Sequence, residues 1–392
     1  MTAPAATTPS FASRLPHVGT TIFTVMSALA AEYKAVNLGQ GFPDFDCDPR
    51  LVEAVSAAMQ QGHNQYPPMP GIPALRQAIA AKTEALYGRA YSADSEITVT
   101  AGATQALLTA IMCCAGPGDE VIVLEPCYDS YVPNIELAGA TARRVPLTPG
   151  SFRPDFDQIT AAIGPRTRAI LINTPHNPSG TVWSPQDMLR LQELLAATNV
   201  LVISDEVYEH MVYAPLRHES VARYPGLAAR SFIVSSFGKT FHVTGWKVGY
   251  VAAPSPLTAE FRKVHQFNVF TVNTPMQHGL AAYLQDPAPY LQLPAFYQAK
   301  RDLFRQGLAQ TKFRLLPCEG TYFQCAAIDS LGVPERGLSE AEFCQWLTRE
   351  IGVTAIPLSA FYGDGFDQKV VRFCFAKQDS TLRGALERLS RL

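Results

Sequence analysis

Residues 200–208 read Val-Leu-Val-Ile-Ser-Asp-Glu-Val-Tyr, a short apolar run that ends in polar and acidic side chains. Such a run is typical of a strand that is buried on both faces of a sheet. Similar runs recur along the chain, with amphipathic segments between several of them, and they lie at 97–99, 121–124, 169–172, 232–235 and 248–252. This alternation predicts the α/β class, with a mainly parallel sheet and helices on both of its faces.

Helical patterns support this fold and change in character near both ends of the chain. Apolar side chains recur at helical spacing over 73–86, and Ser184 before Pro185 is typical of a helix start. Outside about 45–290 the pattern is mixed, with helices expected at 293–308 and 380–392 and strands at 321–327 and 370–375. For a chain of 392 residues, we predict a large domain at 46–289 and a smaller α+β domain from 1–45 plus 290–392.

Composition and charge argue against several classes of protein. With 32 basic and 34 acidic residues the net charge is −2, whereas nucleic-acid binders usually carry a basic stripe. The longest apolar stretch, near 106–115, is too short for a membrane span of about 20 residues. Residues 1–14 lack the pattern of a secretory signal, and neither the eight cysteines nor the histidines show metal-ligand spacing. We therefore expect a soluble cytoplasmic protein with no metal, membrane or nucleic-acid partner.

The segment Ser-Ser-Phe-Gly-Lys-Thr at 235–240 follows one of the expected strands and contains Lys239. A phosphate-binding P-loop would need glycine at position 233, which is Ile233. Taken alone, Lys239 is most simply an exposed lysine in a turn. Polar segments also follow two other strands, at 173–180 and 204–208. Because open α/β sheets bind ligands at the carboxyl ends of their strands, these segments are candidates for a shared site.

Two further features indicate charged ligands at that edge. Asp205 comes directly after a buried strand, where a lone carboxylate is costly unless it meets a cation. Residues 100–107 place small side chains at the start of an apolar helix, whose free backbone N–H groups suit a phosphate. Close helix packing would explain those small residues equally well. There is no Gly-x-Gly-x-x-Gly nearby, so a dinucleotide fold and a nicotinamide oxidoreductase lose their main support.

Seven segments in order resemble the class I aminotransferases of fold type I, with matching spacing across nearly the whole chain. They are NLGQGFPDF (37–45), NQYPPMPG (64–71), TAGATQAL (100–107), NTPHNPSGT (173–181), SDEVYEH (204–210), SSFGKTFHVTGWKVGY (235–250) and VRFCFAK (371–377). Within that class, segments 20–30 and 273–281 are most similar to the methionine aminotransferases, relatives of the kynurenine and glutamine transaminases. The resemblance implies a mixed, mainly parallel seven-stranded sheet flanked by helices, with a smaller α+β domain.

The resemblance also implies pyridoxal 5'-phosphate as the cofactor. Lys239 matches the lysine that binds it covalently and then acts as general base and acid. Asp205 matches the partner of the cofactor's pyridine nitrogen, whose protonation makes the ring an electron sink. Tyr208 and Asn177 match residues that hydrogen-bond the phenolic oxygen of the ring, and Tyr128 matches the aromatic residue that stacks on its face.

For the cofactor phosphate, the resemblance implies the backbone amides of Ala103 and Thr104, the hydroxyl of Ser236 and the charge of Lys247. Members of the wider class often have arginine at the position of Lys247. Lysine acts as a point charge rather than a fork, and we expect cofactor binding to survive that difference. Tyr66 matches a residue that reaches the phosphate of the neighbouring subunit. That role implies a homodimer with shared active sites and one cofactor per chain.

Arg372 matches the residue that forks onto the α-carboxylate of the substrate, for which a planar guanidinium is suited. A structural salt bridge is the alternative for this arginine. The resemblance also places Asn177 at the substrate, and Gly39 would let the backbone approach the same carboxylate.

Segments expected near the substrate's side chain are apolar and include Ile22, Phe23 and the run at 265–273. Filling an apolar pocket is worth about 1–3 kcal/mol per group. This favours methionine, and also phenylalanine, tyrosine, leucine, glutamine or kynurenine, over aspartate. Arg262 and Lys263 are close in sequence and could oppose that preference.

We therefore predict a ping-pong transfer of the amino group from an L-amino acid to a 2-oxo acid through an aminated form of the cofactor. A lyase that removes a β-substituent from cystathionine or a cysteine conjugate is the alternative, because it would share Lys239, Asp205 and Tyr208. A third class is an amino-acid sensor with an N-terminal helix-turn-helix. Only about 35 residues precede the first matching segment, which is too few for such a domain.

Overall fold

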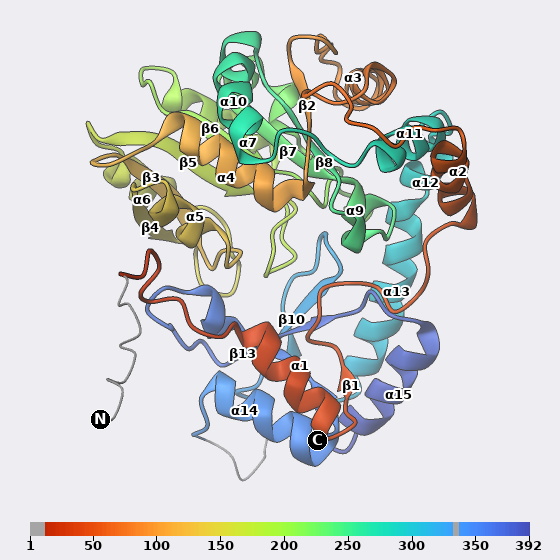
Figure 1. The fold of residues 1–392 in the computed structure, drawn as a ribbon. Coiled ribbons are helices and arrows are strands. Elements are labelled where there is room, and N and C mark those ends of the chain that lie inside the picture. Colours follow the sequence, from red (N-terminus) through yellow and green to blue (C-terminus); the bar gives the residue numbers. More distant parts are fainter. Residues whose placement is uncertain (1–11, 332–336) are drawn as a thin grey trace, which may run out of the picture.

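The computed structural model describes residues 12–331 and 337–392. Residues 1–11 lie outside the described residues. They include most of the stretch in which no secretory signal was expected, and the start of the predicted small domain. A seven-stranded sheet in the order β2-β8-β7-β6-β5-β3-β4 forms the upper part of the molecule (Figure 1). Its strands are β2 (Ile97–Thr100), β3 (Glu120–Glu125), β4 (Thr141–Pro146), β5 (Thr167–Asn173), β6 (Leu201–Asp205), β7 (Ser231–Ser236) and β8 (Gly249–Ala252).

The sheet is mixed, as predicted. Strands β4, β3, β5, β6 and β7 pair in parallel, whereas β8 runs antiparallel to both β7 and β2. The connection from β7 to β8 holds only the four-residue helix α9 (Phe237–Thr240) and a short turn at 244–246. A parallel neighbour would need a long crossover connection, usually a helix, and this connection has none. Strand β8 therefore runs antiparallel to β7.

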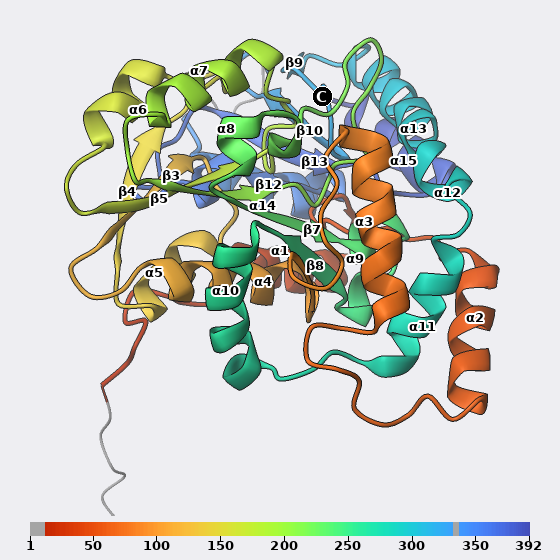
Figure 2. The ribbon, with the colours of Figure 1, turned by 90° about the horizontal axis from the view of Figure 1, so that it is seen from above.

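Helices cover both faces of the sheet. Seen from above, α6, α7 and α8 lie on one side of it and α4, α5 and α10 on the other (Figure 2). Neighbouring residues of a strand therefore enter different apolar clusters, as Ile170 and Leu171 do. The flanking helices are α4 (Gly102–Cys114), α5 (Tyr131–Leu137), α6 (Phe156–Ala162), α7 (Pro185–Leu195), α8 (Pro225–Ala228) and α10 (Ser255–Asn268), and α2 (Pro49–Gln60), α3 (Pro73–Tyr87) and α11 (Thr274–Tyr283) pack at one end.

The lower part of the molecule joins the two ends of the chain (Figure 1). Its antiparallel sheet has the order β12-β13-β10-β9, and β1 pairs in parallel with β11. The strands are β1 (Val36–Asn37), β9 (Arg314–Leu315), β10 (Phe323–Ala327), β11 (Val353–Thr354), β12 (Ile356–Pro357) and β13 (Val370–Cys374). The helices are α1 (Ile22–Glu32), α14 (Glu340–Trp346) and α15 (Asp379–Leu389), together with α13 (Leu293–Leu308), which reaches down from the short helix α12 (Ala288–Leu291) beside α11 (Figure 1).

Local sequence accounts for most element boundaries and for one strand that was not predicted. Helix α7 begins at a capping box, in which Ser184 Oγ accepts from the Asp187 amide at 3.1 Å and the Asp187 carboxylate accepts from the Ser184 amide at 2.8 Å. Strand β4 lies at the edge of the sheet, and of its six residues only Val145 is buried. Its composition therefore lacks the apolar run by which its neighbours were predicted.

No helix in the described ranges is both long and apolar enough to cross a membrane.

Candidate active site

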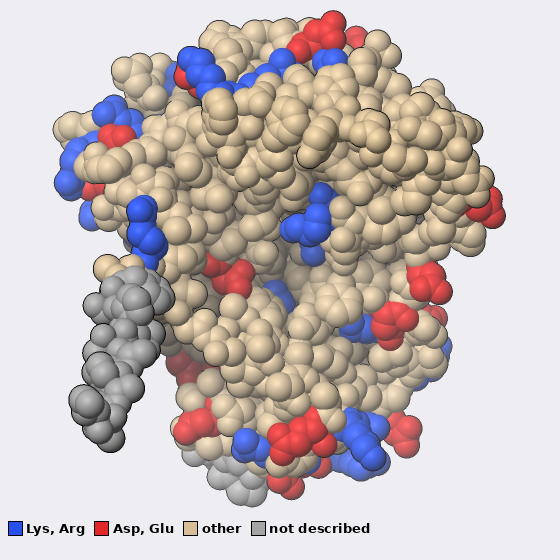
Figure 3. Space-filling model, in the orientation of Figure 1, with Lys and Arg blue, Asp and Glu red and all other residues tan. Residues whose placement is uncertain are grey.

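A cavity of about 290 Å³ lies between the upper sheet and the lower part of the molecule. In the space-filling view this region is a hollow with basic side chains inside it (Figure 3). The carboxyl ends of β5, β6 and β7 contribute to its wall from above, and β10 and β13 contribute from below. Most residues predicted for the site line this cavity, namely Phe23, Ala103, Thr104, Tyr128, Asn177, Asp205, Tyr208, Ser236, Lys239, Lys247 and Arg372.

Three predicted residues lie outside this lining. Gly39 is close by, because its carbonyl oxygen accepts from Arg372 Nη2 at 3.2 Å. Ile22 instead lines a neighbouring cavity of about 370 Å³, which shares Tyr128 with the first. Tyr66 lies on the surface with 82% of its area exposed and packs against Phe270.

The apolar run at 265–273, which was expected near the substrate's side chain, contributes nothing to the cavity lining in the described part of this chain. Phe267 is instead 91% exposed.

Lys239 reaches the cavity from the short helix α9. Its Nζ donates to the phenol oxygen of Tyr322 at 3.1 Å and lies 3.4 Å from the carbonyl oxygen of Gly41. Burial lowers the pKa of Lys239 to about 8, and the positive charges of Arg372 and Lys247 act in the same direction. A larger share of the amine is therefore neutral near pH 7, as a nucleophile or a base requires.

Asp205 stands at the end of β6 and is 3% exposed. Its carboxylate accepts hydrogen bonds from Tyr131 Oη at 2.7 Å and from the Val207 amide at 3.2 Å. Burial nevertheless raises the pKa of Asp205 to about 6. A cation next to this carboxylate would lower that pKa again, so Asp205 fits a protonated ring nitrogen.

Asn173, at the end of β5, connects two of the predicted residues. Its Nδ2 donates to the backbone oxygen of Asp205 at 2.8 Å, and its Oδ1 accepts from the Asn177 amide at 2.8 Å. It therefore fixes the loop that presents Asn177 to the cavity. Sequence reasoning gave no role to Asn173, although it begins one of the matching segments.

The start of helix α4 forms a set of free donors. Gly102 has φ +76°, and within the described residues no side chain caps this helix. A Cβ at Gly102 would lie 3.2 Å from Lys247 Nζ, and one at Gly249 would lie 3.2 Å from the Ala103 nitrogen. The absence of side chains at both glycines keeps Lys247 and the amides at the helix start close together, with Ser236 and Thr104 in the same cavity wall. The set fits a phosphate-sized anion.

Arg372 is almost fully buried, with 1% of its area exposed. Its Nη1 donates to Asn177 Oδ1 at 2.7 Å, and its guanidinium lies 4.0 Å from the ring centre of Phe323. No carboxylate of the described residues comes within the 4.0 Å of an ion pair, so the alternative of a structural salt bridge finds no support there. The charge of Asp129, in the same cavity wall, acts on Arg372 without forming an ion pair, so this buried cation faces a cavity that could admit an anionic ligand.

The comparison with known protein families bears directly on this arrangement. A sequence model of the family "Aminotransferase class I and II" matches residues 33–389. The chain belongs to that family. The match spans both the upper and the lower sheet and every residue predicted for the site except Ile22 and Phe23.

Named relatives cover nearly the whole aminotransferase chain. Methionine aminotransferase of Escherichia coli is 52% identical over 381 residues, which are 97% of this chain and 98% of the relative. A solved structure of an Escherichia coli protein with methionine aminotransferase function has a TM-score of 0.96 at 52% identity and covers 98% of this chain and 100% of its own. The solved structure of N-succinyldiaminopimelate aminotransferase from Mycobacterium tuberculosis has a TM-score of 0.92 at 41% identity. The match covers 97% of this chain and 100% of the other.

A more distant relative is kynurenine–oxoglutarate transaminase 3 of Mus musculus, 35% identical over 96% of this chain and 89% of its own length. These likenesses confirm the predicted fold and the predicted aminotransferase family. Because all of these relatives are named for amino-group transfer, they do not favour the β-lyase alternative.

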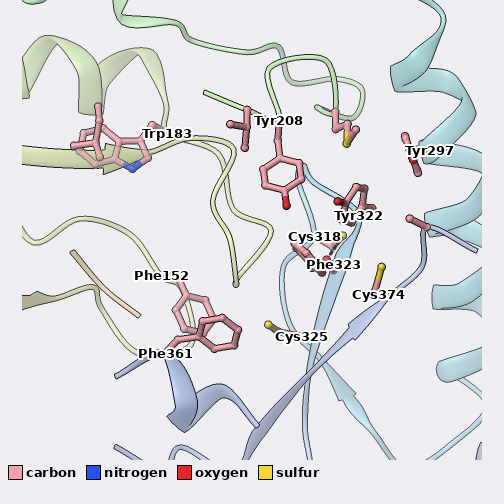
Figure 4. Packing of buried hydrophobic residues seen from close by; sticks show 14 of the residues in the cluster. Phe152, Trp183, Tyr208, Tyr297, Cys318, Tyr322, Phe323, Cys325, Phe361 and Cys374 are labelled. Atoms are coloured by element: carbon pink, nitrogen blue, oxygen red, sulfur yellow. Dashed lines mark hydrogen bonds between the residues drawn. The ribbon is translucent and has the colours of Figure 1, made fainter. Parts of the chain in front are cut away.

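Two aromatic residues that were not predicted lie next to predicted ones: Phe323 lines the cavity of this aminotransferase, and Tyr322 contacts Lys239 from outside the lining. Tyr208 packs edge-on against Tyr322, with ring centroids 5.3 Å apart, and Phe323 lies beside both (Figure 4). The sequence predicted a strand at 321–327 but gave no sign that Tyr322 faces Lys239. Likewise Tyr131, the partner of Asp205, could not be told from an ordinary core tyrosine.

Behind the cavity, on the other side of the turn after β6, Lys82 and Glu209 form a buried ion pair of 2.7 Å. The same carboxylate accepts from Tyr87 Oη at 2.5 Å and Tyr250 Oη at 3.1 Å. We expect Lys82→Met to lower the free energy of unfolding by about 3–5 kcal/mol, because it leaves Glu209 charged and buried without its cation. Denaturant unfolding of the purified variant measures this change.

The double variant Lys82→Met/Glu209→Gln is the matched control, since it removes both charges and keeps the shape of residue 209. It should be more stable than Lys82→Met alone, because no lone charge remains buried. Equal losses in the two variants would contradict an electrostatic origin.

Proposed function

We propose that this aminotransferase holds pyridoxal 5'-phosphate on Lys239 and transfers the amino group of methionine or a similar L-amino acid to a 2-oxo acid. The supporting observation is one cavity that combines a lysine of lowered pKa, a buried carboxylate and a buried arginine without a counter-ion. Burying each of these groups without a ligand costs free energy. The cofactor would be the partner of the lysine and the carboxylate, and the α-carboxylate of an amino acid would be the partner of the arginine.

The chain's own residues take the following parts in this proposal. Asp205 would bind the protonated ring nitrogen, and the ring, when bound, supplies the electron sink for the substrate's Cα–H bond. Tyr208 and Asn177 would hydrogen-bond the phenolic oxygen, with Tyr128 on the ring face. The start of α4, with Ser236 and Lys247, would bind the phosphate.

Arg372 would bind the substrate's α-carboxylate beside Asn177 and the backbone at Gly39. Lys239 would release the cofactor to the substrate and then move a proton from the substrate's Cα, as a buried amine with a pKa of about 8 can do near neutral pH.

Charge supports a preference for an uncharged side chain on the substrate. Among the described residues, the cations that line the cavity are Lys239, Lys247 and Arg372, and each already has a proposed partner. Arg262 is held away from the cavity by the Ile97 carbonyl at 2.7 Å, and Lys263 pairs with Glu260 at 2.6 Å. A second carboxylate on the substrate would therefore find no further cation among the described residues that line the cavity, whereas methionine needs none.

The visible absorption of the purified protein tests both cofactor and substrate. We expect an absorption band of the bound cofactor that bleaches on addition of L-methionine without a 2-oxo acid, and that changes at least about 100-fold more slowly with L-aspartate at equal concentration. A protein that stays colourless after incubation with pyridoxal 5'-phosphate would overturn the proposal. A coloured protein that ignores methionine but releases ammonia and pyruvate from a cysteine conjugate would be a lyase instead.

We also propose a homodimer with shared active sites, in which Tyr66 reaches the phosphate of the partner subunit. Support comes from three aromatic side chains that are exposed in the single chain. Tyr66 has 82% of its area exposed, Phe267 has 91% and Phe270 has 40%. Burial in an interface would explain these side chains. Analytical ultracentrifugation tests this, and a monomer at micromolar concentration would contradict it.

The division into domains at 46–289 and at 1–45 plus 290–392 remains our proposal, supported by the pairing of β1 with β11. A cytoplasmic location is also proposed. All eight cysteines lie in described residues and all are free, which suits a reducing compartment.

A further inference from the structure

The amine of Lys239 is held in a closed triangle of polar atoms. Lys239 Nζ lies 3.1 Å from Tyr322 Oη and 3.4 Å from the carbonyl oxygen of Gly41. Tyr322 Oη in turn donates to the same Gly41 oxygen at 2.6 Å. Gly41 belongs to the segment at 39–42 and Tyr322 precedes β10, so two distant parts of the chain meet at the lysine.

The direction of these hydrogen bonds is determined by the number of available protons. A phenol has one proton, and that of Tyr322 is committed to Gly41. The phenol oxygen can therefore only accept from the amine. Tyr322 is 1% exposed, and burial raises its pKa well above the ordinary value, so it keeps its proton at all working pH values. The lysine thus meets an acceptor that does not change its role with pH.

The ring of Tyr322 is itself fixed by its neighbours. It packs edge-on against Tyr208 at 5.3 Å and against Phe323 at 4.9 Å, and it lies 5.7 Å from the ring of Tyr297 (Figure 4). Large aromatic rings that are packed in this way have little freedom to move. The oxygen that accepts from Lys239 therefore occupies a well-defined place.

We propose that Tyr322 is the positioning residue for Lys239, and that its phenol oxygen places the amine for bond formation and for proton transfer. The inference rests on the proposed function, in which the lysine nitrogen bonds to the aldehyde carbon of the cofactor. In that step the nitrogen gives up two protons, which leave with the aldehyde oxygen as one water. The rate depends on where the nitrogen stands, since a misplacement of about 1 Å can cost up to about 100-fold.

The test measures the rate at which the cofactor becomes covalently bound. Full-length protein freed of cofactor is mixed with pyridoxal 5'-phosphate, reduced with borohydride at successive times, and the label at Lys239 is counted by mass spectrometry. The measurement is made at about pH 9.5, above the Lys239 pKa of about 8, so that the amine is mostly neutral in every variant. Differences in rate then report position and not protonation.

Tyr322→Phe removes the acceptor and keeps the ring. We expect covalent binding about tenfold slower than in the parent protein, the effect of one lost hydrogen bond on a positioned group. With methionine, kcat should fall by a similar factor while KM changes little, because the residues proposed to bind the substrate are untouched.

Tyr297→Phe is the matched control. It removes a neighbouring buried phenol hydroxyl that has no hydrogen-bond partner among the described residues, and it should leave the rate unchanged. Should Tyr322→Phe fail to fold, Tyr322→Met fills much of the same volume without an oxygen and repeats the test.

The outcomes separate this inference from the proposed function. Slow binding in Tyr322→Phe with a normal rate in Tyr297→Phe supports the positioning role. Equal rates in Tyr322→Phe and the parent protein overturn it, while the proposed function stands. If the parent protein itself acquires no label at Lys239, both the proposed function and this inference fail.

Discussion

Lys239→Ala should abolish the covalent cofactor and slow methionine turnover by at least about 10⁴-fold, the upper range of what one positioned general base contributes. The loss combines two effects. Alanine offers no amine to bind the cofactor, and no base then remains at the place where Lys239 Nζ meets Tyr322 and Gly41. Pyridoxal 5'-phosphate should still bind, without a covalent bond, at the start of α4 and at Asp205.

Mass spectrometry after borohydride reduction measures the covalent bond, and keto-acid formation from methionine measures turnover. Lys247→Met is the matched control, since it also removes one cavity lysine. That variant should bind the cofactor more weakly, because it lacks the proposed phosphate contact, yet it should still become labelled at Lys239. Labelling of Lys239→Ala at another lysine with retained turnover would contradict the proposed role.

Arg372→Met should lower kcat/KM for methionine by about 10²- to 10⁴-fold, the worth of two charge-assisted hydrogen bonds to a carboxylate. It should leave the stability of the cofactor-free protein nearly unchanged, because the removal of a desolvation cost offsets the loss of the hydrogen bonds to Asn177 and Gly39. The desolvation cost arises because Arg372 is 1% exposed and has no carboxylate partner among the described residues. Replacing an uncompensated buried cation by an apolar side chain removes a desolvation cost.

Arg76→Met provides the opposite case for comparison. Arg76 is also buried, at 7% exposed, but it pairs with Asp94 at 2.9 Å and donates to the Gly71 carbonyl at 3.1 Å, and none of these three residues lines the cavity. It should therefore lower the free energy of unfolding by about 1–3 kcal/mol, through lost hydrogen bonds, with little change in kcat/KM. Thermal unfolding and steady-state kinetics on both variants measure the contrast. A large loss of stability in Arg372→Met would contradict a role in ligand binding alone.

The sequence could predict those features that depend on local pattern. The strand at 200–204 and its polar end at Asp205 follow from a buried apolar run, and helix α13 at Leu293–Leu308 matches its predicted range. Lys239 could be singled out only together with the other matching segments, because a lysine after a strand is by itself an ordinary turn residue.

Features that depend on side-chain contacts between distant residues could not be predicted in this way. Tyr322 and Gly41 are 281 positions apart, and Lys82 and Glu209 are 127 apart, so no local pattern links either pair. The position of Ile22 depends on contacts of the same kind, and its role at the substrate remains a prediction. Its segment reaches the cavity, as Phe23 shows, but the rotation of helix α1 directs Ile22 into the neighbouring cavity.

The pairing of β1 with β11 has a consequence for synthesis on the ribosome. Val36 has Val353 as its strand partner, so α1 and β1 must wait for more than three hundred further residues before their neighbours exist. The upper sheet is complete at β8, near residue 252, and can fold while translation continues. Gly39 follows β1, and Arg372 lies in β13 near the end of the chain. The side of the cavity that we propose to bind the carboxylate is therefore assembled last, after the side proposed to bind the phosphate has formed.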